Sequence, residues 1–114
     1  MTIGERKVDG VMIVDAAGKI TMGDGSDIML RDKMRSLVQQ GERRILLNLA
    51  DVNYVDSAGL GEIVQAYATA TKNGGTLKLL NPTKRLQDLL SITKLLTVFD
   101  TYDSEADAVK SFGR

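Results

Sequence analysis

The stretch DVNYVDSAGLG (Asp51–Gly61) joins a buried strand to a long helix. The apolar run Ile45–Leu49 before it is typical of a strand that is covered on both faces. After a connection at Asp51–Asp56, a helix is predicted over Ser57–Asn73, where apolar residues recur with helical spacing at Leu60, Ile63, Val64 and Tyr67. We therefore expect Ser57 to stand at the N-terminus of an amphipathic helix, at one end of a sheet.

Strands and helices continue to alternate toward the C-terminus. Gly74–Gly75 ends the long helix, and Thr76–Leu80 predicts a second buried strand. Pro82 is tolerated in the first turn of a helix whose apolar residues are Leu86, Leu89 and Leu90. Val98–Phe99 predicts a last short strand. Asp103–Ser104 can cap a final helix, whose apolar residues are Ala106, Val109 and Phe112.

The N-terminal third predicts antiparallel strands. Asp9–Gly10 separates two β-type runs, Ile3–Val8 and Val11–Asp15. Such a two-residue connection favours a tight hairpin, because both positions tolerate positive φ. Lys19–Met22 predicts another short strand, which Gly18 separates from the strand before it. The loop Gly23–Asp27 then ends in a helix cap.

A further helix is predicted over Ile28–Gln40, with Gly41 as a natural stop and apolar residues at Leu30, Met34, Leu37 and Val38.

Alternating strands and helices define an α/β fold. The sequence therefore predicts a single domain over residues 1–114, with a mixed sheet: antiparallel N-terminal strands, a parallel remainder, and about four helices packed against it. The start at Met1 and the final helix lead us to expect a complete protein.

The composition excludes several classes of partner and chemistry. Fifteen basic and fifteen acidic residues give a formal net charge of zero, so we expect neither a nucleic acid nor an anionic membrane surface as partner. The chain has no cysteine, which excludes disulfides and thiolate sites, and no histidine, which removes the usual general base and the commonest metal ligand. No stretch approaches the ~20 apolar residues of a membrane span, and Met1–Lys7 does not resemble a signal peptide. We therefore expect a cytoplasmic location without membrane insertion.

Enzyme motifs are incomplete in this chain. Val55–Gly59 mimics a nucleophile elbow, but it lacks the first glycine of G-x-S-x-G, and no histidine can deprotonate the serine. A Ser–Lys variant remains formally open, although no lysine is placed to serve it. No G-x-x-x-x-G-K-[ST] phosphate loop occurs, and Gly59–Gly61 is only a fragment of a dinucleotide fingerprint, so both glycines are interpreted as sites of close helix packing. We expect no enzymatic activity, no catalytic residue and no cofactor.

Four aspartates suggest a magnesium site like that of phospho-aspartate receiver domains: Asp24, Asp27, Asp51 and Asp56. Such a domain needs an acidic pair after its first strand, where this chain has only Asp15 followed by two alanines. Asp24 and Asp27 are better explained as loop and cap residues. No metal is expected.

Ser57 or Asp56 can be explained as a helix N-cap, whose side chain accepts a hydrogen bond from a free backbone amide. Val52–Gly61, however, resembles the signature of STAS domains (sulfate transporter and anti-sigma factor antagonist). In these domains a hydrophobic strand leads through an Asp-Ser-(Ser/Ala)-Gly-Leu turn into the second helix. The resemblance extends along the chain at Gly18–Ile20, Leu47–Leu49, Gly74–Gly75, Asn81–Pro82 and Leu89–Phe99.

The resemblance is to the anti-sigma factor antagonists of this family. In these proteins the serine that corresponds to Ser57 is phosphorylated by a partner kinase, which is itself the anti-sigma factor. The unphosphorylated form binds that partner and frees the sigma factor, and a metal-dependent serine phosphatase resets the switch. The resemblance implies that Ser57 is the phosphoacceptor and that Asp56 and Gly59 shape its turn. Many relatives have a serine or an aspartate at three positions that differ here: Ala58, Thr21 and Asn48.

The expected partner-binding surface surrounds Ser57. It combines the end of the sheet, the loop Gly23–Asp27 and the exposed side of the following helix. Its predicted residues are Asp24, Ser26, Asp56, Ser57, Ala58, Gly59, Leu60 and Glu62, with Gln65 beside them. A phosphate adds about −1.5 to −2 charges, and a helix N-terminus favours an anion. We therefore expect phosphorylation to act at an interface and not on the fold.

Two other functions remain open from the sequence. The chain could be a scaffold or accessory STAS subunit of a stress-signalling or lipid-transport complex, with Ser57 as a plain cap. It could also be a weak nucleotide-binding module, although no phosphate cradle supports this. A weak homodimer is compatible with each of these functions.

Overall fold

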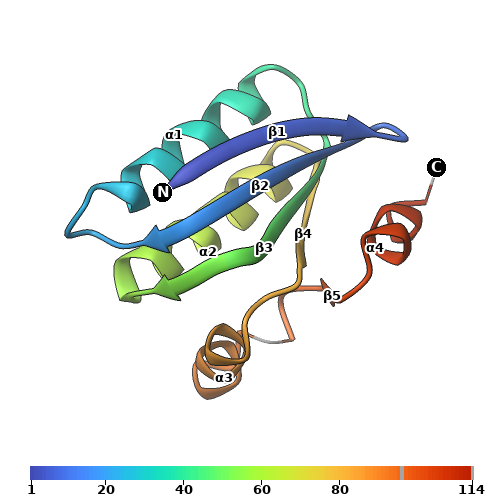
Figure 1. Ribbon diagram of the computed structural model, residues 1–114. Helices are drawn as coiled ribbons and strands as arrows, with labels where there is room; N and C mark the ends of the chain where they lie inside the picture. Colours follow the sequence, from blue (N-terminus) through green and yellow to red (C-terminus); the bar gives the residue numbers. More distant parts are fainter. Residues whose placement is uncertain (96, 114) are drawn as a thin grey trace.

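Five strands form one sheet in the order β1-β2-β3-β4-β5 in the computed structural model, which describes residues 1–95 and 97–113 (Figure 1). The strands are β1 (Thr2–Val8), β2 (Val11–Ile20), β3 (Arg44–Val55), β4 (Thr76–Leu80) and β5 (Thr101–Tyr102). β1 and β2 are antiparallel, and the other neighbouring strands are parallel. The helices of this described part are α1 (Ser26–Gln39), α2 (Ser57–Lys72), α3 (Lys84–Ile92) and α4 (Glu105–Ser111). The predicted α/β fold, with a mixed sheet and about four helices, is confirmed.

The predicted hairpin joins β1 to β2. Asp9 and Gly10 have φ angles of 50° and 81°, which are the left-handed conformations that a two-residue type I′ connection requires. Val8 and Val11 face each other across the turn. The Asp-Gly pair therefore sets the register of β1 on β2.

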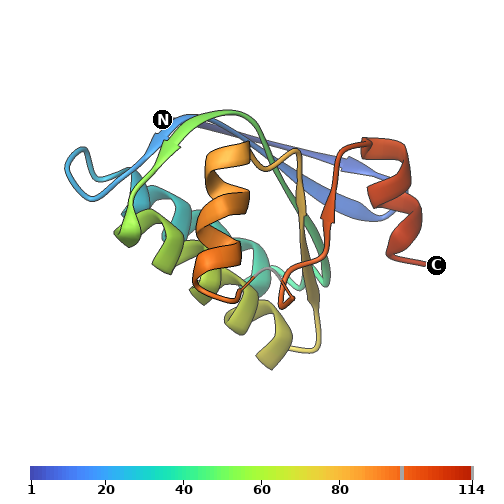
Figure 2. The same cartoon turned by 90° about the horizontal axis from the view of Figure 1, so that it is seen from below.

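The two faces of the sheet carry separate apolar clusters, because successive side chains of a strand point to opposite faces. Met12 and Val14 of β2 lie in the main cluster, together with residues of α1, α2 and α3. Val11 and Ile13 lie in the second cluster, against Val109 of α4. Figure 2 shows α1, α2 and α3 grouped together and α4 apart from them. The central strands are thus covered on both faces, which explains why β3 starts as an apolar run.

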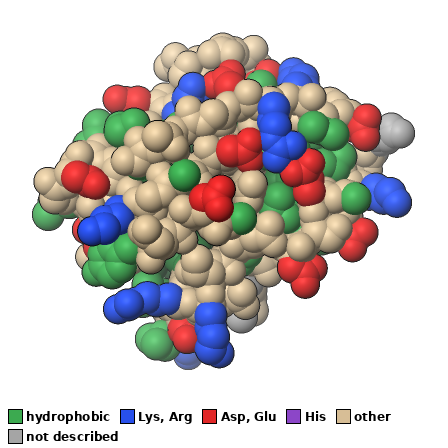
Figure 3. Space-filling view, in the orientation of Figure 1, with side chains coloured by type: hydrophobic (Ala, Val, Ile, Leu, Met, Phe, Trp, Pro, Cys, Tyr) green, Lys and Arg blue, Asp and Glu red, His purple; other side chains and the backbone are tan. Residues whose placement is uncertain are grey.

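Polar contacts attach both ends of α4 to the sheet. The guanidinium of Arg6 pairs with the carboxylates of Asp15 at 2.7 Å and Glu105 at 2.6 Å. At the other end, Nζ of the buried Lys78 donates to the carbonyl oxygen of Ser111 at 3.0 Å and to its Oγ at 2.9 Å. A cation at this position is favourable because the C-terminal end of a helix carries partial negative charge. Acidic and basic side chains also lie next to one another on the face drawn in Figure 3.

β3 is longer than the sequence predicted. We interpreted Asp51–Asp56 as a connection, but β3 continues as far as Val55, so this prediction is wrong. The last part of β3 pairs with β2, whereas the last partner of β4 on β3 is Asn48. Because β4 does not flank this part, four of its side chains reach solvent, those of Ala50, Asp51, Asn53 and Tyr54, while Val52 and Val55 are buried. A prediction based on continuous apolar runs misses a strand of this kind.

The connection from β2 to α1 also differs from the prediction. β2 continues through Gly18, which has a φ of 99° and lies beside an irregularity in the pairing with β3. The separate strand predicted at Lys19–Met22 is therefore wrong: its first two residues end β2, and its last two lie outside the strand. α1 begins at Ser26, earlier than predicted, after an N-cap at Gly25 in the left-handed conformation.

The predicted strand at Val98–Phe99 is wrong as well. Phe99 is buried in the main cluster and packs edge-to-face on Tyr67, with their ring centroids 5.2 Å apart. Its apolar character therefore reflects a core contact made from a turn. The last strand lies further along, at Thr101–Tyr102, where it pairs with the end of β4.

Candidate functional site

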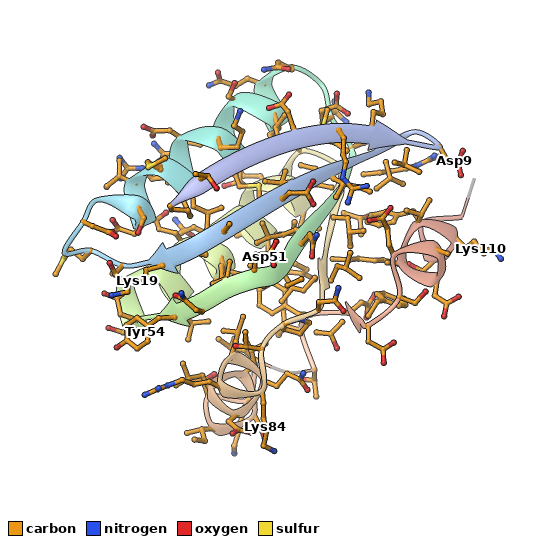
Figure 4. The ribbon with its side chains drawn as sticks, viewed as in Figure 1. Asp9, Lys19, Asp51, Tyr54, Lys84 and Lys110 are labelled. Atoms are coloured by element: carbon orange, nitrogen blue, oxygen red, sulfur yellow. The ribbon has the colours of Figure 1, made fainter. Side chains whose placement is uncertain are left out.

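The candidate site lies at the end of the sheet where β2 and β3 finish side by side. Lys19 pairs with Tyr54, and Ile20 pairs with Val55. Figure 4 shows Lys19 and Tyr54 close together at this end. Because the two strands are parallel, the segments that follow them leave the sheet at the same edge. The β2–α1 loop therefore meets the start of α2, where Ser57 stands.

Asp56 connects these two segments through a single carboxylate. Its Oδ1 accepts a hydrogen bond from the N–H of Gly59 at 2.8 Å and so caps α2. Its Oδ2 accepts a second hydrogen bond from the N–H of Met22 at 3.1 Å. The N–H of Asp56 itself donates to the carbonyl oxygen of Ile20 at 3.3 Å. Asp56 thus fixes both the start of α2 and the position of the β2–α1 loop.

Ser57 is the first residue of α2 and is exposed. The sequence left open whether Ser57 or Asp56 caps the helix, and the structure shows that the cap is Asp56. The Ser57 hydroxyl is therefore not required for capping. The free N–H groups of the first turn and the helix dipole create a positive potential around it, which favours an anion at this position.

Gly59 is a position in the turn where no side chain fits. A β-carbon there would lie 2.1 Å from the carbonyl oxygen of Ile20. A β-carbon on Gly61 would meet no atom within 4 Å. The interpretation that both glycines allow close packing is therefore confirmed for Gly59 and wrong for Gly61.

The loop Thr21–Gly25 is held by internal hydrogen bonds. Oδ1 of Asp24 accepts hydrogen bonds from Oγ1 of Thr21 at 2.9 Å, from the N–H of Ser26 at 3.0 Å and from the Ser26 hydroxyl. Oγ of Ser26 in turn accepts a hydrogen bond from the N–H of Thr21 at 2.7 Å. The donors on Asp24, the Ser26 hydroxyl first, lower the pKa of its carboxyl group to about 2. Asp24 therefore carries a negative charge at neutral pH in the loop that Asp56 holds against the start of α2.

The residues predicted to bind a partner separate into two groups. Those that reach solvent, wholly or in part, are Asp24, Asp56, Ser57, Ala58 and Glu62. Those that are buried are Ser26, Gly59 and Leu60. The buried residues shape the surface from within and do not present side chains to a partner, which corrects the expectation that they contribute direct contacts.

Met22 is the residue of this site that the sequence did not reveal. Its side chain is 70% exposed, although it is apolar. The sequence predicts a strand at this position, and a single methionine before a glycine-rich loop gives no signal of its own. Its relation to the site depends on the hydrogen bond to Asp56, which joins residues far apart in the sequence.

Beside the site, α1 and α2 enclose a groove of about 140 Å³. It is lined by Arg31, Met34, Arg35, Glu62, Gln65, Ala66 and Thr69. A larger cavity of about 390 Å³ lies at the ends of β4 and β5, lined by Asn81, Pro82, Gln87, Thr101, Tyr102 and Asp103.

In residues 1–95 and 97–113, no cluster of acidic side chains is arranged to hold a metal ion. No helix in the same ranges has the length and apolar character needed to cross a membrane.

Comparison with known families assigns the class of this protein. Residues 4–108 match the model of the STAS domain. The chain therefore belongs to the STAS domain family, which confirms the resemblance recognised in Val52–Gly61.

Individual relatives carry names that refer to one function. An anti-sigma-B factor antagonist of Bacillus subtilis (strain 168) is 41% identical over 88 residues, which are 76% of this chain and 77% of that protein. An anti-sigma F factor antagonist of Paenibacillus polymyxa is 28% identical over 101 residues, which are 88% of this chain and 85% of that protein.

Solved structures share the fold over nearly the whole chain. An anti-sigma factor antagonist from Mycobacterium paratuberculosis has a TM-score of 0.83 at 22% identity, covering 96% of this chain and 92% of that one. The Bacillus cell fate determinant SpoIIAA, in its phosphorylated form, has a TM-score of 0.77 at 18% identity, covering 97% of this chain and 99% of that one. At these identities the likeness shows the fold.

Proposed function

We propose that this protein is an anti-sigma factor antagonist whose binding to an anti-sigma factor serine kinase is switched off by phosphorylation of Ser57. The observation that carries this proposal is that the helix cap and the exposed hydroxyl belong to two different neighbouring residues. Asp56 caps α2, while the hydroxyl of Ser57 is exposed and free of that role. A kinase can therefore reach Ser57 in the folded protein, and the phosphate replaces no cap. The names of the relatives support the same function.

The phosphate exerts its effect at the interface with the partner. At an exposed helix N-terminus an anion is favoured by roughly 0.3–1 kcal/mol, so the domain keeps its fold. When a charge is buried against a partner surface that has no counter-charge, the free energy of binding becomes less favourable by about 2–5 kcal/mol. Since each ~1.4 kcal/mol is tenfold in affinity, the complex weakens roughly 30-fold to several thousand-fold.

Local charge adds to this effect. Asp56 directly precedes Ser57, and Asp24, whose hydrogen bonds lower its pKa to about 2, belongs to the loop that Asp56 holds against the start of α2. The partner surface that fits the unphosphorylated site must already accommodate these carboxylates. A phosphate adds about −1.5 to −2 charges beside them, which raises the local negative charge beyond what that surface is built to receive.

The proposal implies a cycle with two partners. The unphosphorylated protein binds the anti-sigma factor kinase and thereby releases a sigma factor in the cytoplasm. The kinase phosphorylates Ser57 and dissociates, and a metal-dependent serine phosphatase restores the hydroxyl. In this cycle the protein itself is a binding module without enzymatic activity or cofactor.

Mass spectrometry tests the proposal. The purified protein is incubated with ATP and a lysate of its native host, and is compared with Ser57→Ala and with Ser36→Ala, which removes an exposed serine of α1. We expect one added phosphate on the wild type and on Ser36→Ala, mapped to Ser57, and none on Ser57→Ala. If Ser57 stays unmodified while a control substrate is phosphorylated in the same lysate, the switch is wrong and a scaffold subunit is favoured.

A further inference from the structure

Exposed apolar side chains gather at the end of the molecule that carries Ser57. Four large apolar residues are exposed there: Met22 (70%), Ile28 (40%), Met29 (45%) and Tyr54 (39%). Elsewhere in the described part of the chain, the exposed large apolar residues are Ile92 and Val98. Isolated exposed apolar residues are common and need no explanation. The guanidinium of Arg85 on α3 lies over the ring of Tyr54, and Met29 lines a shallow pocket with Ile3 of β1. Of the four residues, Met22 is the one whose backbone is hydrogen-bonded to Asp56, the residue directly before Ser57.

The backbone of Met22 is fixed although its side chain is exposed. Its N–H donates to Oδ2 of Asp56 at 3.1 Å, and its carbonyl oxygen accepts a hydrogen bond from the N–H of Gly25 at 3.1 Å. The carbonyl oxygen of Thr21, the preceding residue, accepts a hydrogen bond from the N–H of Asp27 at 3.2 Å. A partner that covers Met22 therefore does not have to order its backbone, and the conformational entropy that remains to be lost is that of the side chain itself.

Met22 also lies within reach of any protein that acts on Ser57. Its N–H is bonded to the carboxylate of Asp56, the residue directly before Ser57. A specific protein–protein interface covers about 800 Å² on each partner. A kinase that brings its active site onto the Ser57 hydroxyl therefore covers the Met22 side chain as well.

We infer that Met22 is the apolar contact through which the kinase recognises the Ser57 site, and that Asp56 is the residue that positions Met22 for this contact. The kinase then offers an apolar pocket beside its active site. A methionine suits such a contact because its unbranched, polarisable side chain adapts to the shape of the pocket. This inference rests on the proposed function and adds to it the residue that carries recognition.

Two substitutions separate the roles of these residues. Met22→Ala removes the apolar side chain and leaves the backbone bonds in place. Asp56→Asn keeps the N-cap, since asparagine caps helices as well as aspartate does. The amide of Asn at this position then faces the N–H of Met22 with donor against donor, so the hydrogen bond that holds Met22 to the start of α2 is lost. Ile92→Ala is the matched control, because Ile92 is 78% exposed and lies on α3, outside the site.

Steady-state phosphorylation of Ser57 tests the inference, with the purified kinase identified by its action on Ser57. We expect Met22→Ala to raise KM at least tenfold while kcat stays within about twofold, because the side chain contributes to binding and not to phosphoryl transfer. Asp56→Asn should raise KM by a similar factor. Ile92→Ala should leave both constants unchanged. In the double variant, KM should rise no further than in the more impaired single variant, since both changes remove one contact.

The possible failures are distinct. A wild-type KM for Met22→Ala overturns the role of Met22 and leaves the proposed function intact. Fully additive effects of Met22→Ala and Asp56→Asn overturn the positioning role of Asp56. If no kinase phosphorylates wild-type Ser57, the proposed function itself is wrong.

Discussion

Gly59 packs directly against the carbonyl oxygen of Ile20, so closely that a β-carbon on the glycine would lie 2.1 Å from that oxygen. This contact joins the first turn of α2 to the last residue of β2. The N–H of Asp56 donates to the same carbonyl oxygen. The turn that carries Ser57 is therefore built directly onto the end of β2, and its geometry depends on the absence of a side chain at Gly59.

We expect Gly59→Ala to destabilise the protein by about 3 kcal/mol, because the new methyl group forces α2 away from β2. Gly61→Ala is the matched control in the same helix. It should stabilise the protein by about 0.5–1 kcal/mol, because alanine favours the helical backbone and open space surrounds that position. Chemical denaturation measures both free energies of unfolding. Equal stabilities of the two variants would contradict the packing described at Gly59.

The elements with local signals were predictable from the sequence. Asp9–Gly10 specifies its hairpin through backbone conformation alone, and Ile45–Leu49 shows its burial by its composition. The extension of β3 to Val55 was not predictable, because the exposure of its side chains depends on where β4 ends. Phe99 was mistaken for a strand residue because its partner in the core, Tyr67, is distant in the sequence.

The candidate site was predictable to a similar extent. Ser57 could be located because a helix N-terminus after a strand is a local feature. The second hydrogen bond of Asp56 and the exposure of Met22 could not, because they arise where two separate connections meet at one end of the sheet. Burial of Ser26 and Leu60 likewise depends on tertiary packing.

Phosphorylation should leave the domain folded, and Ser57→Asp tests this expectation. A negative charge at the first residue of α2 interacts favourably with the helix dipole. We expect the free energy of unfolding of Ser57→Asp to equal that of the wild type or to exceed it by up to about 1 kcal/mol. Thermal and chemical denaturation provide the measurement. A loss of more than about 1 kcal/mol would mean that the switch acts by unfolding the site.

Lys78 should contribute substantially to stability, although it is a lysine within a strand. Lys78→Met keeps the apolar stem and removes the hydrogen bonds to Ser111. We expect a loss of about 1.5–3 kcal/mol, which is typical for hydrogen bonds made by a charged group. Lys110→Met, on the exposed side of α4, should change stability by less than about 0.5 kcal/mol. Equal stabilities of these two variants would show that Lys78 does not hold α4.

Acid should weaken the attachment of α4. Hydrogen bonds from Arg6 lower the pKa of Asp15 and that of Glu105. A carboxyl group with a lowered pKa in the folded state stabilises the protein above its ordinary pKa, and this contribution is lost as the pH falls through the lowered value. The free energy of unfolding should therefore decrease below about pH 4.5, the ordinary value for Glu105. Arg6→Met should show a shallower decrease.

The size of this effect is limited by solvent. The side chains of Arg6, Asp15 and Glu105 are 38% to 41% exposed, so each pair contributes up to about 1 kcal/mol. High salt should reduce the difference between wild type and Arg6→Met, because exposed charges are screened. Denaturation curves between pH 2 and pH 7, at roughly 0.05 M and 0.5 M NaCl, provide the measurement. Identical pH profiles for the two proteins would contradict this account of α4.

One phosphate on Ser57 is expected to weaken partner binding strongly without changing the fold. The most direct test is a calorimetric titration of the purified kinase with two samples of this protein, one unmodified and one fully phosphorylated on Ser57. We predict that the unmodified protein binds and that the phosphorylated protein binds at least roughly 30-fold more weakly, while the phosphorylated sample unfolds at the same temperature as the unmodified one or slightly above it. Equal affinities of the two samples would contradict a phosphorylation switch at Ser57.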